Sequence, residues 1–116
     1  MRISSTTGGQ HGKVLSEARY TSEGTKGLAH KGGSARRAAV AKMVEELGGK
    51  LEAFYFAFGD VDVYTIVGVP DSVTAAAISL AVNQSGVVTV KNVVLISPED
   101  MDKASKKAVD YRPPGR

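Results

Sequence analysis

The aspartates Asp60 and Asp62, two residues apart in an otherwise apolar stretch, are the first residues whose types and spacing could support chemistry. One carboxylate of such a pair could act as a general base or orient an arginine. Both lie near a turn, where aspartates commonly accept hydrogen bonds from the local backbone instead. Because Asp62 begins an apolar strand, it is the catalytic candidate of the two, and Asp60 is a candidate for ligand binding.

His30 and Tyr64 are further candidates for an acid–base group. His30 could act as a general base or as an axial haem ligand, whereas a histidine in a glycine-rich connection is ordinarily an exposed, solvated side chain. Without a nearby cysteine or acidic partner, one histidine is too little for a zinc site, so we expect no metal and no cofactor. Tyr64 and Tyr55 could donate a proton, but tyrosines in apolar strands are typical of a core or an interface.

Arg36 and Arg37 begin the first long predicted helix, where a cation is slightly unfavourable against the helix dipole. Free backbone N–H groups after the glycines at 32 and 33 make an anion-binding role worth testing, although a solvated face would also explain the arginines. The glycines match neither phosphate-binding loop pattern. The expected ligand-binding residues are Tyr20, Arg36, Arg37, Tyr55 and Asp60.

Charge and composition exclude several classes of protein. Residues 1–50 hold nine Lys/Arg against four Asp/Glu, but these basic residues are dispersed and the aromatic residues are predicted to be buried, which argues against nucleic-acid binding. No stretch approaches the roughly 20 apolar residues of a membrane helix. The chain has no cysteine, which excludes disulfides and thiolate sites and is compatible with a reducing cytosol. We therefore expect a cytoplasmic protein.

The pattern of the sequence predicts one α+β domain over residues 13–110, after a flexible leader (1–12) and before a tail (111–116). Glycines at 24, 27, 32 and 33 indicate an irregular connection with one short helical turn around 25–30. Ser34 is expected to cap the first long helix. The predicted strands are 13–20, 51–58, 61–69 and 87–96, and the predicted helices are 34–47, 72–84 and 98–109.

This order, β-α-β-β-α-β with an added C-terminal helix, is the ferredoxin-like split βαβ pattern, with a four-stranded antiparallel sheet. Spacing predicts that the first helix buries a stripe ending at Leu47 and that the second buries a stripe including Val73 and Leu80. Strict alternation in the strand 51–58 leaves both of its faces apolar. One face would carry Leu51, Ala53, Tyr55 and Ala57, and the other Phe54, Phe56 and Phe58.

Helices from one chain can cover only one of these two faces. The uncovered apolar face could be buried by a second copy, stacked sheet to sheet in a homodimer, or by the extra C-terminal helix folded over it. We favour the homodimer because the exposed apolar side chains are worth about 1.5–3 kcal/mol each on burial.

Four stretches of the sequence, residues 18–28, 32–40, 48–60 and 111–115, carry a resemblance to a known family. The most specific runs from Gly48 to Asp62 and begins Gly-Gly-Lys-Leu-Glu-Ala-Phe-Tyr-Phe-Ala-Phe-Gly-Asp. Together they resemble the GYD-domain family of small bacterial proteins of uncharacterised function. The family's Gly-Tyr-Asp triplet corresponds here to residues 59–62, where the tyrosine is not in its usual place and Asp62 takes the position of the aspartate.

The resemblance implies the dimeric α/β-barrel superfamily, which includes cofactor-free monooxygenases, lactone isomerases, haem enzymes and effector-binding domains. Fold does not transfer a reaction, so two functions stay open. The first is a homodimer, or a higher oligomer, that binds a small metabolite between sheet and helices. The second is a cofactor-independent monooxygenase- or isomerase-like enzyme that uses Asp62, His30 or a tyrosine as its acid–base group.

Overall fold

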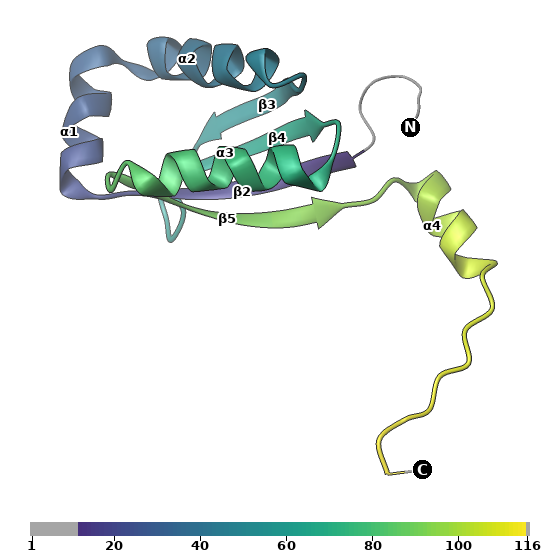
Figure 1. The fold of residues 1–116 in the computed structure, drawn as a ribbon. Coiled ribbons are helices and arrows are strands. Elements are labelled where there is room, and N and C mark those ends of the chain that lie inside the picture. Colours follow the sequence, from purple (N-terminus) through teal and green to yellow (C-terminus); the bar gives the residue numbers. More distant parts are fainter. Residues whose placement is uncertain (1–11, 116) are drawn as a thin grey trace.

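The computed structural model describes residues 12–115, and its elements are labelled in Figure 1. Residues 1–11, most of the expected leader, lie outside the described part. β2 starts at Gly12, one residue before the expected domain boundary. The strands are β2 (Gly12–Tyr20), β3 (Lys50–Phe56), β4 (Val63–Val69) and β5 (Val88–Leu95), and the helices are α1 (Ser22–Lys31), α2 (Gly33–Glu46), α3 (Ser72–Gln84) and α4 (Pro98–Ser105).

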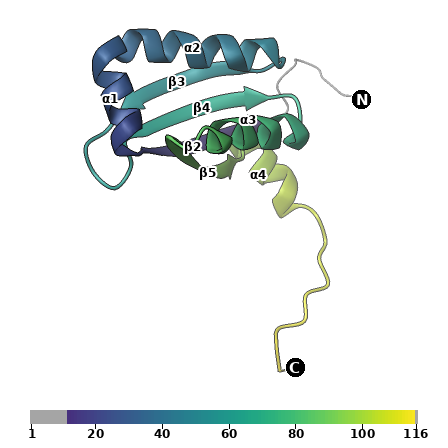
Figure 2. The ribbon, with the colours of Figure 1, turned by 60° about the vertical axis from the view of Figure 1, so that its left-hand side comes forward.

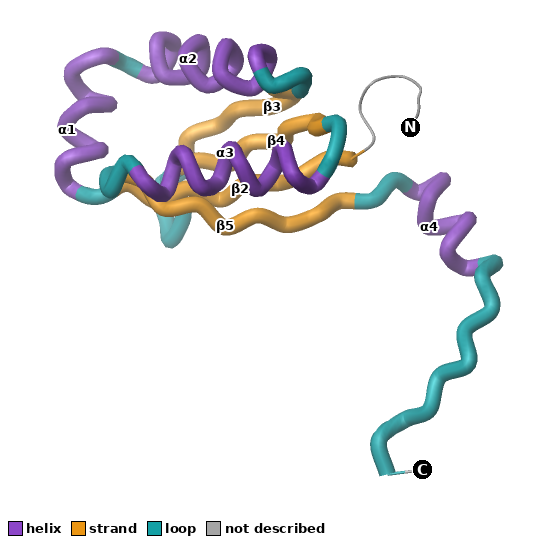
Figure 3. Tube along the Cα trace, viewed as in Figure 1, coloured by secondary structure: helices purple, strands orange, loops and turns teal. Residues whose placement is uncertain are grey.

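The four strands form one antiparallel sheet in the order β3-β4-β2-β5. α1 and α2 connect β2 to β3, and α3 connects β4 to β5, so two split βαβ units interleave in one sheet. Figures 1 and 3 show α2 and α3 on the same side of the sheet. The predicted α+β, ferredoxin-like fold is confirmed. We call the side under these helices the covered face and the opposite side the open face.

The core lies between the covered face and the two long helices. Its buried centre consists of Val14, Val44, Val67 and Val69, of which Val44 is 1% exposed. Partly buried side chains pack around them from both helices and from β3. Burying a valine of this kind is worth about 1.5–3 kcal/mol, so these contacts fix α2 on the sheet.

The prediction of an irregular connection before α2 is wrong, because residues 22–31 form a helix of ten residues. Thr21 caps it: its hydroxyl accepts a hydrogen bond from the backbone N–H of Gly24 at 3.2 Å. Gly24 is required for close approach, since a Cβ there would lie 2.4 Å from the carbonyl oxygen of Val87. The glycine that looked like a helix breaker therefore lets the helix pack against the start of β5.

Three predictions about the two long helices are corrected. Ser34 does not cap α2, which starts at Gly33 with no side-chain cap at all. Leu47 lies beyond the end of α2 and is 44% exposed. Val73 and Leu80 of α3 are 75% and 71% exposed, because the helix turns Ala75, Ile78 and Val82 toward the sheet instead.

The predicted alternation of β3 is wrong as well, because a β-bulge between Leu51 and Ala53 shifts its register against β4. Leu51 packs on the core, and Phe54 and Phe56 also point to the covered face. Their rings meet edge to face with centroids 5.2 Å apart. Phe54 and Phe56 therefore share a face with Leu51, although strict alternation placed them on the opposite face.

The hairpin between β3 and β4 closes through a loop, not a tight turn. β3 ends at Phe56 and β4 begins at Val63, and the backbone N–H of Ala57 donates to the carbonyl of Asp62 at 2.8 Å. Phe58, predicted to be in the strand, is at the loop tip and fully exposed. Val61 is 4% exposed and anchors the loop to the domain.

The C-terminal helix α4 and the residues after it lead away from the sheet (Figures 1 and 2). α4 ends at Ser105, earlier than predicted, and all of its residues are exposed. This helix therefore does not cover the open face, which removes one of the two explanations for the apolar strands. None of the helices within residues 12–115 is both long and apolar enough to cross a membrane.

Candidate functional site

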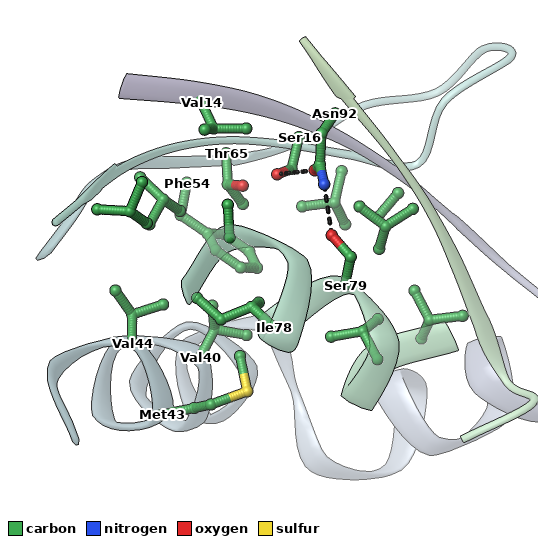
Figure 4. Close-up of a pocket in the computed structure, with 18 of the residues that line it drawn as sticks. Val14, Ser16, Val40, Met43, Val44, Phe54, Thr65, Ile78, Ser79 and Asn92 are labelled. Carbon is green, nitrogen blue, oxygen red and sulfur yellow. Dashed lines mark hydrogen bonds between the residues drawn. The ribbon is translucent and has the colours of Figure 1, made fainter. Parts of the chain in front are cut away.

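The two long helices lie apart over the covered face and leave a cleft between them. α2 packs on β3, whereas α3 packs on β4 and β5. Between them lies a cavity of about 80 Å³ whose floor is the centre of the sheet. Figure 4 looks into this cavity, with Val40, Met43 and Val44 of α2 on one wall and Ile78 and Ser79 of α3 on another.

The strand register arranges the side chains of the covered face in three rows that run across the sheet, and the cavity lies over their central part. Two of these rows are apolar and enclose the third. The outer rows are Leu51–Val67–Val14–Val94 and Phe56–Val63–Ala18–Val90, and the middle row is Phe54–Thr65–Ser16–Asn92. The middle row therefore places two hydroxyls and one amide side by side beneath the cleft.

A chain of hydrogen bonds links most of this polar row to α3. The Ser16 hydroxyl donates to Oδ1 of Asn92 at 2.7 Å, and Nδ2 of Asn92 donates to the Ser79 hydroxyl. Thr65 lies beside Ser16 and is only 9% exposed. Within residues 12–115, the Thr65 hydroxyl has no hydrogen-bond partner, which is unusual for a buried polar group.

The cavity widens into an outer groove of about 630 Å³ between α1, α2 and α3. Arg36, Val40 and Met43 line both spaces, so the groove is the mouth of the cavity. Further charged or titratable side chains around this mouth are Glu23, His30 and Lys31. The polar groups therefore change character with depth, from charged at the mouth to neutral at the floor.

The structure brings some of the predicted ligand-binding residues together and separates others. Tyr20 and Arg36 both line the cavity and its mouth. Arg37 points to another side of α2, where it lines a shallow hollow with Phe54 and Phe56 among others. Asp60 is exposed in the hairpin loop, and Tyr55 is 71% exposed on the open face.

The three predicted catalytic residues do not share a site. His30 lies at the mouth of the cleft, Tyr64 is on the open face opposite Tyr55, and Asp62 lines none of the described cavities. Glu23 also lies at the mouth, but it is two helical turns from His30, about 10 Å along the helix axis. Among residues 12–115, no three His, Asp or Glu side chains are grouped so that they could hold a metal ion.

The open face carries its own row of side chains across all four strands. Ala53, Ile66, Leu15 and Val93 are aligned by the register, and each is partly exposed. The next row is polar or amphipathic and consists of Tyr55, Tyr64, Glu17 and Lys91. At the other side of the apolar row, Nζ of Lys13 pairs with Oε1 of Glu52 at 2.6 Å.

With the geometry described, comparison with known proteins identifies the family. The GYD domain model matches residues 15–105, which run from within β2 to the end of α4. The chain belongs to the GYD domain family. No curated protein and no solved structure matches it. Family membership is thus shown for most of the chain.

In this GYD domain, Asp62 has a definite structural contact. Its Oδ2 accepts a hydrogen bond from the backbone N–H of Tyr20 at 2.8 Å, and its own N–H donates to the carbonyl of Ala18 at 2.9 Å. These bonds tie the hairpin loop to the end of β2, 42 residues away in sequence. Asp62 therefore fixes the start of β4 and the hairpin loop against β2.

The polar row of the GYD domain was missed by reasoning from the sequence. Ser16, Thr65 and Asn92 each occupy an inward position in a strand that otherwise turns small or apolar side chains to the core. In each strand taken separately, a polar residue at an inward position could indicate a functional site. Only the register, which the sequence does not display, shows that the three residues are neighbours.

Proposed function

We propose that this GYD domain is a homodimer that binds a small metabolite in the cleft between α2, α3 and the sheet. The separation of the two helices over the sheet is the observation that carries the binding part of the proposal. Helices that met over the sheet would close the core, whereas here the sheet centre remains accessible through the outer groove. Ligand sites of proteins are typically apolar concavities with a few well-placed polar groups, and the cleft has this composition.

A binding function is favoured over catalysis because of where the candidate groups lie. His30 is at the mouth of the cleft, whereas the Asp62 carboxylate is engaged by the backbone of Tyr20 outside it. A general acid or base must come within hydrogen-bond reach of the reacting group. Side chains on separate parts of the domain cannot act on one small ligand.

The dimer is supported by the open face. Its apolar row of Ala53, Ile66, Leu15 and Val93 spans the whole sheet, and α4 does not fold over it. A twofold axis through this row would stack two sheets face to face and bury the row of each copy. The absence of cysteine from the sequence suits a cytoplasmic setting, which we include in the proposal.

A thermal-shift screen of small metabolites, followed by two tryptophan substitutions in α2, tests the binding site. Val40 faces the cleft, and Ala38 is exposed on the same helix. We expect Val40→Trp to abolish binding of any hit because the indole fills the cleft, and Ala38→Trp to leave it unchanged. Circular dichroism checks that both variants fold. A hit that binds both variants as it binds the wild type would contradict this site.

Light scattering on a size-exclusion column tests the dimer. Ile66→Asp places a charge in the apolar row of the open face, and we expect it to halve the mass observed at micromolar concentration. Leu80→Asp is the matched control, because Leu80 is a large apolar residue exposed on α3. A wild-type monomer, or a mass halved only by Leu80→Asp, would contradict an interface on the open face.

A further inference from the structure

Thr65 carries a hydroxyl that lies at the cavity floor and has no hydrogen-bond partner within residues 12–115. It is a strand residue with 9% exposure, and its side chain lies on the cavity floor beside Ser16 (Figure 4). Its hydroxyl has one donor and two acceptor lone pairs, none of which is used within the part of the chain that the structure describes. A buried hydroxyl without a partner is costly, so this position is prepared for a hydrogen bond from outside the chain.

The remaining groups of the polar row define what such a partner must present. The Ser16 hydroxyl proton is engaged by Asn92, and Ser79 accepts from Asn92, which leaves the Ser79 proton available. Within residues 12–115, the available hydroxyl protons therefore belong to Thr65 on the floor and Ser79 on the wall. Both are neutral donors, and neutral donors in an apolar cavity favour an uncharged acceptor such as a carbonyl oxygen.

The surroundings of the row define the rest of the ligand. Two apolar rows of the sheet enclose it, so the ligand atoms next to the acceptor must be hydrocarbon. The mouth of the cleft is lined by two cationic side chains, Arg36 and Lys31, and by one carboxylate, that of Glu23. This excess of cations over the described anions suits a ligand whose outer end is negative.

We propose that the cleft selects carboxylic acids whose apolar body carries a carbonyl group, with the carbonyl on Thr65 and the carboxylate toward Arg36. This assignment rests on the proposed ligand-binding function and names the ligand class of the same site. The carbonyl oxygen accepts from the Thr65 hydroxyl, which gains its missing partner. The hydrocarbon body of the ligand displaces water from the two apolar rows, and its carboxylate remains at the charged mouth.

Two acids that differ in one oxygen test the assignment: 4-oxo-4-phenylbutanoate and 4-phenylbutanoate. Isothermal titration calorimetry on the full chain measures the affinity for each. We expect the wild type to bind the oxo acid about five- to tenfold more tightly, as one hydrogen bond would give. Without that hydrogen bond, 4-phenylbutanoate should bind more tightly because it is the more hydrophobic acid. Thr65→Val, which removes the hydroxyl but keeps the shape of the side chain, is therefore expected to reverse the preference for the oxo acid.

Thr89→Val is the matched control, because Thr89 is an exposed threonine of β5 that is not on the cavity floor. It should leave the preference for the oxo acid intact. Thr65→Val should also keep or raise the melting temperature in the absence of ligand, since it removes a buried unpaired hydroxyl. A large fall in melting temperature would show that Thr65 already has a partner and would overturn the assignment.

The remaining outcomes separate this assignment from the broader binding function. Equal affinity of the wild type for both acids, or a preference that survives Thr65→Val, would overturn the role of the carbonyl while leaving the cleft as a binding site. If neither acid binds at millimolar concentration, the ligand class is wrong. The cleft itself would be overturned only if every hit of the thermal-shift screen also bound Val40→Trp.

Discussion

On β4, the side chains of Val63, Thr65 and Val67 point to the covered face, and those of Tyr64 and Ile66 point to the open face. The first three are at most 9% exposed, whereas Tyr64 is 39% exposed. The same strand thus supplies part of the floor of the cleft and one residue, Ile66, of the apolar row on the open face. The difference arises from the helices within residues 12–115, which cover one face incompletely and leave the other uncovered.

In the proposed function, each face of the sheet has a separate role. The covered face has enough apolar area to hold the fold together, so its central polar row is available for recognition. The open face needs no polar recognition if its partner is a second copy, because an apolar row related by a twofold axis is complementary to itself. Substitutions at neighbouring positions on opposite faces should therefore have different consequences.

The largest expected effect separates Val67 from its neighbour Ile66. Val67 is 7% exposed on the covered face, so Val67→Asp buries a charge without a partner. We expect a loss of more than about 4 kcal/mol in the free energy of unfolding, which would leave the chain largely unfolded. Urea unfolding monitored by circular dichroism provides the measurement.

Ile66→Asp is the control for that prediction. It should fold as a monomer and lose less than about 1 kcal/mol at a protein concentration where both proteins are monomeric. A loss as large as that of Val67→Asp would mean that the open face is part of the monomer's own core, and the distinction between the faces would fail.

The next effect concerns Asp62, which joins the hairpin loop to β2. Asp62→Ala removes the acceptor of the Tyr20 backbone N–H, and we expect a loss of about 1–3 kcal/mol in the free energy of unfolding. Asp62→Asn retains an oxygen acceptor and should lose less. Asp60→Ala, in the exposed part of the same loop, should change stability by less than about 0.5 kcal/mol. Equal losses for Asp62→Ala and Asp60→Ala would show that the contact with Tyr20 contributes nothing.

The smallest effect is a pH dependence at the start of α3, one wall of the cleft. The pKa of Asp71 is lowered from 3.8, because the Thr74 hydroxyl and then the Thr74 backbone N–H donate to its carboxylate. A carboxyl whose pKa is lowered in the folded state stabilises the fold above its unfolded pKa. That stabilisation should be fully present at pH 7 and disappear as the pH falls below about 3.8 through the lower folded value.

Thermal melts of the wild type and Asp71→Asn between pH 7 and pH 2 measure this dependence. Asparagine also caps helices but does not titrate in this range, so the small advantage of the wild type at pH 7 should vanish at low pH. An advantage that grows as the pH falls would contradict the sign of the pKa shift.

Much of the fold could be predicted from the sequence because its strands and helices carry local signals. Val63–Val69 is rich in β-branched residues, and Ser97 and Pro98 mark the start of α4. The bulge at Leu51 could not be predicted, because it depends on how β3 pairs with β4. The glycines of α1 suggest an irregular segment for a similar reason. Gly24 is needed where α1 approaches Val87 closely, and this contact exists only in the folded chain.

The candidate site was less predictable than the fold. Tyr20 and Arg36 were identified because their side chains are visibly suited to binding, and both line the cleft. The polar row was not identified, because serine, threonine and asparagine are individually common and the row consists of residues from three strands that are distant in the sequence. Aspartates and tyrosines are candidates because their side chains can exchange protons, yet Tyr55 and Tyr64 lie on the face opposite the cleft.

Methyl NMR spectra of protein labelled at valine and isoleucine test the division between the two faces most directly. Dilution should shift the methyl signals of Ile66 and Val93 on the open face, as the dimer dissociates. Titration with 4-oxo-4-phenylbutanoate should shift those of Val14, Val67 and Ile78 around the cleft, and leave Ile66 and Val93 in place. Shifts of the open-face methyl groups on titration, with none around the cleft, would contradict the account.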